Sequence, residues 1–141
     1  MKTFSESIDS SFLQFLDQKS IRLHQITPNL IILSSSGFCL KIYDRLGHGG
    51  NSATVNISRH YSEDLYVSDD CNIYWVLDHF NLSMTSSFSE HTPEQYSKNL
   101  PLLIDDIVTC IGCLEKVSAN SHSWTQFLDS VHTKALKQWS T

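Results

Sequence analysis

The chain has 141 residues, a formal net charge of −5, 40% hydrophobic residues and 18% charged residues. This length and composition predict a single domain, residues 1–141, with a substantial hydrophobic core, and they exclude an intrinsically disordered chain. Fifteen acidic residues against ten basic ones argue against nucleic-acid binding, because a phosphate backbone requires a clustered basic surface.

The N-terminal sequence MKTFSESIDSSF has no basic segment followed by an uninterrupted apolar stretch, so no export signal is predicted. The longest fully apolar run, residues 30–33, is far shorter than the ~20 residues that span a bilayer. We therefore expect a cytoplasmic protein that does not bind membranes and whose four cysteines are reduced.

The first predicted element is a helix from Ile8 to Lys19, with Ser5 or Ser7 as its cap. Its apolar residues fall on one helical stripe: Ile8, Phe12, Phe15 and Leu16. Short runs rich in branched and aromatic residues then predict strands at 21–26, 30–33, 38–43 and 53–57, with turn residues between them.

The sequence GHGGNS, residues 47–52, joins the last two of these strands. A phosphate-binding P-loop would need a lysine after the last glycine, but Asn51 and Ser52 follow Gly50. A dinucleotide-binding loop would need a helix there, and a strand-like run follows instead. We therefore predict a hairpin turn in which glycine supplies positive φ.

The C-terminal half changes to a helical period. Ser68 is predicted to cap a helix with Asp69 and Asp70 in its first turn, and a polar loop, residues 81–91, follows that helix. Thr92 begins a capping box, and Pro101 should start a second segment or kink the helix. A last helix, capped by Ser123, should bury six residues: Trp124, Phe127, Leu128, Val131, Ala135 and Leu136.

This order predicts an α+β fold: an N-terminal helix, an antiparallel meander of three to four strands, then three C-terminal helices packed on one face of the sheet. One face of the predicted strand 38–43 carries Cys39, Lys41 and Tyr43, with His24 nearby. In a one-sided sheet this polar face is wetted. Alternatively it is a docking surface with Tyr43 as an anchor, because tyrosine is favoured at interfaces.

No catalytic or metal-binding motif stands out, and no cofactor is predicted. Cys110 and Cys113 form a CxxC within an amphipathic helix, where packing is the expected role. A zinc site would need two further ligands, with Cys39 and Cys71 as candidates only if the fold brings them together. The seven histidines show no metal-binding spacing. The acid pairs at 63–64, 69–70 and 105–106 are interpreted as solvated charge or helix-start acids.

This layout resembles the small immunity proteins of bacterial polymorphic and contact-dependent growth-inhibition toxin systems. The features that carry the resemblance are the N-terminal helix, the meander, the serine-rich loop, the long helix containing KNLPLLIDDI (residues 98–107) and a final helix with a tryptophan. The resemblance implies a non-enzymatic inhibitor that binds one cognate toxin domain, often a nuclease.

An acidic protein can capture a basic nuclease domain through complementary charge. We expect the chain itself to be a monomer. The candidate partner-binding residues are the acids Asp44, Glu63, Asp64, Asp69 and Asp70, the aromatic residues Tyr43, Tyr61 and Tyr66, and the loop residue His48. Two alternatives remain open at this point. One is a secretion chaperone, for which a second strand meander would be expected after the middle helix; the other is a small enzyme or zinc-binding protein.

Overall fold

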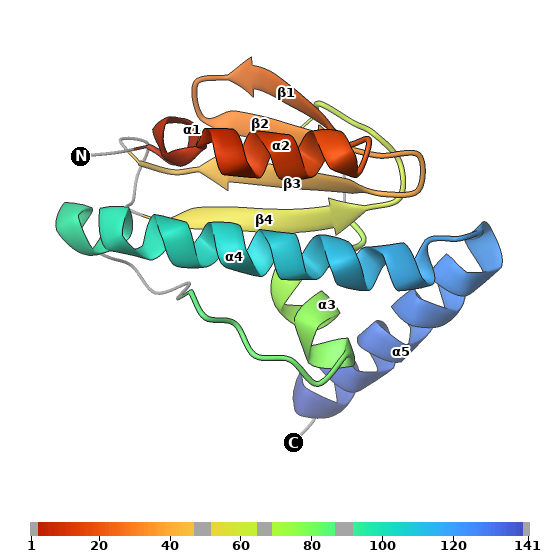
Figure 1. The fold of residues 1–141 in the computed structure, drawn as a ribbon. Helices are drawn as coiled ribbons and strands as arrows, with labels where there is room; N and C mark the ends of the chain where they lie inside the picture. The colour runs from red at the N-terminus through yellow and green to blue at the C-terminus, as the bar shows by residue number, and fades with distance from the viewer. Residues whose placement is uncertain (1–2, 47–51, 65–68, 87–91, 140–141) are drawn as a thin grey trace.

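Five antiparallel strands form a sheet whose spatial order follows the chain, with helices packed against it (Figure 1). The computed structural model describes residues 3–46, 52–64, 69–86 and 92–139. The strands are β1 (Arg22–Thr27), β2 (Leu30–Ser34), β3 (Cys39–Asp44), β4 (Ala53–Ser58) and β5 (Cys71–Asn72). The helices are α1 (Phe4–Ser7), α2 (Ser10–Gln18), α3 (Ile73–His79), α4 (Pro93–Val117) and α5 (Ser121–Trp139). The predicted α+β order is confirmed.

The strands around the glycine loop pair as a hairpin. β3 and β4 are antiparallel neighbours in which Asp44 lies opposite Ala53, and the Arg45 amide donates to the Ser52 carbonyl at 2.9 Å. The pairing that the sequence predicted is therefore present, while residues 47–51, with His48 and the three loop glycines, lie outside the described residues. Sequence reasoning missed the two-residue strand β5, which pairs with β4 at Asn56 and Ile57.

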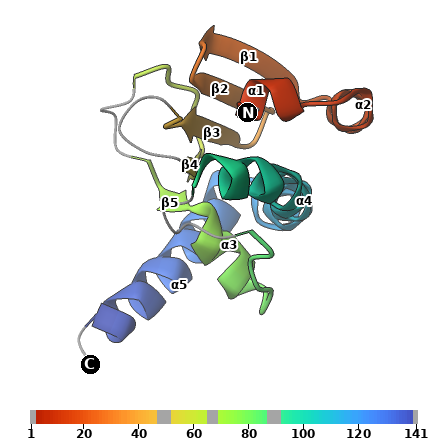
Figure 2. The ribbon, with the colours of Figure 1, turned by 90° about the vertical axis from the view of Figure 1, so that its left-hand side faces the viewer.

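The hydrophobic core lies between one face of the sheet and the helices. Figures 1 and 2 show α2 and α4 lying across the same face of the sheet. On that face the alternating residues of the central strands are fully buried: Leu33, Leu40, Val55 and Ile57 are all 0% exposed. Figure 2 also shows the C-terminal end of α5 projecting away from the sheet. Among the described residues, no helix is long and apolar enough to cross a membrane.

The N-terminal helix differs from its prediction. Instead of one helix from Ile8, two helices form, and Ile8 between them has extended backbone. Asp9 caps α2, since its carboxylate accepts from the Phe12 amide at 2.9 Å, whereas Thr3 caps α1 through a capping box with Glu6. The predicted caps, Ser5 and Ser7, were wrong because Asp9 is a strong capping residue that starts the helix anew.

The capping box at Thr92 is confirmed, but α4 then continues through Pro101 as one helix of 25 residues. The prediction of a second segment was wrong. Pro101 is exposed, whereas Leu100 and Leu103 beside it are buried. Burial of the apolar face on both sides of the proline offsets the one hydrogen bond that its missing amide removes.

The caps of α3 and α5 also differ from prediction. Asn72 caps α3 and accepts from the Tyr74 amide; Asp69 and Asp70 precede β5, so neither is in the first turn of the helix, and Ser68 lies outside the described residues. α5 begins three residues earlier than expected, at Ser121, and the Asn120 side chain accepts from the Ser123 amide at 2.8 Å. Its expected inward residue Leu136 is 70% exposed.

Candidate functional site

On the face of the sheet opposite α2 and α4, side chains that are mostly polar lie in rows, because directly paired residues point to the same side. One row crosses four strands: Arg22, Ser34, Cys39 and Ser58. The next row crosses all five: His24, Ile32, Lys41, Asn56 and Asn72. Sequence alternation indicated this face, but only the register shows which residues of different strands lie side by side.

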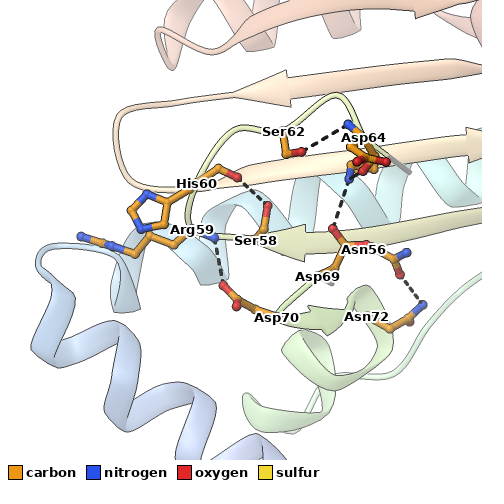
Figure 3. A network of polar contacts seen from close by, with 10 residues as sticks. Asn56, Ser58, Arg59, His60, Ser62, Asp64, Asp69, Asp70 and Asn72 are labelled. Carbon is orange, nitrogen blue, oxygen red and sulfur yellow. Dashed lines mark hydrogen bonds and ion pairs between the residues drawn. The ribbon is translucent and has the colours of Figure 1, made fainter. Parts of the chain in front are cut away.

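Residues 59–64, which we name the strap, return across this face after β4 (Figures 2 and 3). The Lys41 ammonium donates to the Asp64 carbonyl at 2.8 Å and lies 3.5 Å from the Asp69 carboxylate. Lys41 is only 5% exposed and Cys39 only 3%. The prediction of a wetted face was therefore wrong for these two residues, because the strap excludes water from them.

Asp70 joins the first residue of the strap, Arg59, to the final helix, α5. Its carboxylate accepts from the Arg59 amide at 2.9 Å (Figure 3) and from the Trp124 indole at 3.1 Å. The Arg59 guanidinium lies over the Trp124 ring and donates to the carbonyls of Gly37 and Ser118. Asp70, which was predicted to contact a partner, is half-buried, and the internal bonds from the Arg59 amide and the Trp124 indole are both accepted by its Oδ2 atom.

Asp44 is also internal. It is 3% exposed and accepts three hydrogen bonds, from the Phe4 amide at 2.8 Å, the Leu46 amide at 2.9 Å and the Tyr96 hydroxyl at 2.5 Å. Burial, followed by the bond to Asp44 and its charge, raises the pKa of Tyr96. The prediction that Asp44 contacts a partner was wrong, because the carboxylate joins α1, β3 and α4.

Asp106 overturns the interpretation of the pair 105–106 as solvated charge. Asp105 is exposed, but Asp106 is 3% exposed. Its carboxylate accepts from the backbone amides and hydroxyls of Thr85 and Ser86. It therefore holds the segment after α3 against α4, which accounts for a buried acid on the apolar side of that helix.

Three of the predicted partner-binding residues are exposed, and they lie together on the strap. Tyr61 is 43% exposed, packs edge-on against His24 with ring centroids 5.1 Å apart, and donates to Glu63 at 3.0 Å. Glu63 and Asp64 are exposed. Tyr43 is half-buried, as is Asp69, whereas His48 and Tyr66 lie outside the described residues.

The four cysteines are free thiols. Cys110 and Cys113 lie in the core, as their packing role predicted. Burial raises the pKa of Cys110 well above its usual value and, helped by the charges of Asp70 and Asp69, raises the pKa of Cys71 to about 12. In the described part of the chain, no group of three histidine, cysteine or acidic residues is placed to hold a metal ion.

Between the strap and the edge of β1 lies a depression of about 370 Å³. Arg22, His24, Ser34, Arg59, His60 and Tyr61 contribute to its lining. Sequence reasoning placed His24 near this face but missed the two arginines. The alternation of Arg22 with His24 was the available signal, while Arg59 reaches the depression only because the strap folds back. Comparisons with protein-family models, with curated proteins and with solved structures find no match to this chain.

Proposed function

We propose that this chain is a non-enzymatic immunity protein that binds and neutralises a cognate bacterial toxin domain of the nuclease type in the cytoplasm, without a cofactor. The observation that carries the proposal is the strap. It presents an aromatic side chain and two carboxylates, Tyr61, Glu63 and Asp64, on the outside of the molecule. Its backbone is held at both ends, because the Asp64 carbonyl accepts from Lys41 and the Arg59 amide donates to Asp70.

This arrangement suits the capture of a basic protein surface. A rigid tyrosine supplies contact area at low entropic cost, and residues of this kind often dominate binding energy. Exposed carboxylates and a net charge of −5 would speed association with a positively charged domain. Because the strap backbone is already held in place, binding costs little conformational entropy.

The structure weakens the argument for a secretion chaperone, which predicts a second meander after the middle helix. Within the described ranges, only helices follow α3. The absence of that meander from the described residues favours the immunity proposal over capture of an unfolded segment.

The test is co-expression with the toxin domain encoded next to this gene. The wild-type chain should restore growth and co-elute with the toxin on gel filtration. Glu63→Lys and Tyr61→Ala should each weaken binding by about tenfold or more, the effect of losing an important interface residue. Asp129→Lys is the matched control, since Asp129 is an exposed acid on α5 and should bind as the wild type does.

Two results would count against the proposal. If the wild-type chain neither restored growth nor formed a complex, the immunity function would be rejected. If Asp129→Lys abolished binding and Glu63→Lys did not, the function would stand but the strap would be the wrong surface.

A further inference from the structure

The depression beside the strap has a composition unlike that of the whole molecule. The chain is acidic overall, yet none of the described residues that line this depression is acidic, and two arginines and two histidines line it: Arg22, Arg59, His24 and His60. Their side chains come from β1 and from the strap, so only the folded chain brings them together. We propose that this depression binds a small phosphate monoester.

The two arginines supply the charge. Arg22 is exposed and forms no salt bridge among the described residues. Arg59 donates to two backbone carbonyls from its Nη1 atom alone, and a guanidinium has five N–H donors in all, so Nε and Nη2 retain theirs. Guanidinium groups match the geometry of phosphate oxygens and form charge-assisted bonds with them.

Neutral hydrogen-bond donors complete the part of the depression that would bind the phosphate group. Ser34 lies directly opposite Arg22 in the register of β1 and β2, and its hydroxyl is 2.9 Å from the His24 Nε2 atom. A serine hydroxyl donates as well as accepts, so it can bond a phosphate oxygen while the imidazole fixes its position. Ser36, also on the lining, is exposed at the turn after β2.

The size of the depression and its aromatic wall favour an ester over the free ion. A volume of about 370 Å³ falls within the usual range of small-molecule sites, roughly 300–1,000 Å³. A bare phosphate ion fills only a few water volumes of about 30 Å³ each. Tyr61, whose ring packs edge-on against His24, is part of the lining, so a small apolar or aromatic group of the ester would have a ring to pack against.

The test uses the purified full chain and two probes, inorganic phosphate and phenyl phosphate, titrated calorimetrically at constant ionic strength. Both should bind saturably, and phenyl phosphate more tightly. Arg22→Gln should weaken both by about tenfold or more, as expected for loss of a charge-assisted bond. Tyr61→Ala should weaken phenyl phosphate and leave inorganic phosphate unchanged. Arg45→Gln is the control, because Arg45 is exposed and does not line the depression.

Several results would overturn the site. They are failure of both probes to bind the wild type, equal loss of binding in Arg22→Gln and Arg45→Gln, and binding of inorganic phosphate with exclusion of the ester. No toxin domain takes part in this experiment, so its outcome is independent of the immunity function. Each variant replaces an exposed side chain, and circular dichroism would verify that it remains folded.

Discussion

Replacing Asp44 with alanine should strongly destabilise the protein. The substitution leaves three buried donors without an acceptor: the amides of Phe4 and Leu46 and the hydroxyl of Tyr96. An unsatisfied buried donor costs about 1–3 kcal/mol, so the three together cost about 3–9 kcal/mol. Removing a buried carboxylate also removes its desolvation cost, which offsets part of this loss. We expect the free energy of unfolding to fall by about 3–6 kcal/mol.

Tyr96→Phe isolates one of the three bonds. It deletes the phenol oxygen and leaves both amides bonded to Asp44, so the expected loss is about 1.5–3 kcal/mol, the value of a hydrogen bond to a charged group. The double variant should cost less than the sum of the single variants, because both remove the same bond.

The assay is urea unfolding followed by tryptophan fluorescence and circular dichroism, with extrapolation to zero denaturant. Asp129→Ala, a change at an exposed acid, should alter stability by no more than about 0.5 kcal/mol. If Asp44→Ala cost less than about 1 kcal/mol, or if the effects of Asp44→Ala and Tyr96→Phe were strictly additive, the carboxylate would not be the junction of α1, β3 and α4 that its contacts describe.

Three further predictions test other parts of the structure. The folded chain holds the proton of Cys71 up to about pH 12, whereas the unfolded thiol, with an ordinary pKa of 9.0, loses it earlier. The contribution of this thiol to the free energy of unfolding therefore decreases above pH 9 by about 1.4 kcal/mol per pH unit. Between pH 8 and pH 10.5 the wild type should therefore lose stability relative to Cys71→Ala, as measured by guanidinium unfolding. A constant difference between the two proteins would contradict burial of the thiol. Gly37→Ala should destabilise by about 1–3 kcal/mol, because its Cβ would lie 3.0 Å from the Ser118 carbonyl oxygen. Gly112→Ala, which meets nothing within 4 Å, should stabilise α4 by up to about 1 kcal/mol; equal effects in thermal unfolding would refute the steric argument. Thr92→Ala should cost about 1 kcal/mol by loss of the α4 cap, and an unchanged urea midpoint would show that the cap is dispensable.

Local sequence patterns predicted most of the strands and helices. Short runs rich in branched and aromatic residues, bounded by turn residues, predicted β1 to β4, and the threonine–proline–glutamine start predicted α4, because both signals depend on neighbouring residues. The same reasoning predicted the hairpin around the glycine loop. It was wrong at the caps of α2, α3 and α5, where an asparagine or aspartate close to the predicted cap provided the bond instead.

Tertiary structure decided which charged residues are available to a partner. Asp44, Asp70 and Asp106 look alike in the sequence to Glu63, an exposed acid on the strap. Each of the first three accepts from donors that are distant in the sequence. Phe4 and Tyr96 lie 40 and 52 residues from Asp44, and Trp124 lies 54 residues from Asp70. Thr85 and Ser86 lie 21 and 20 residues from Asp106. A buried carboxylate is tolerated only where such donors converge on it. Convergence of this kind depends on how distant segments pack, and no local pattern contains it.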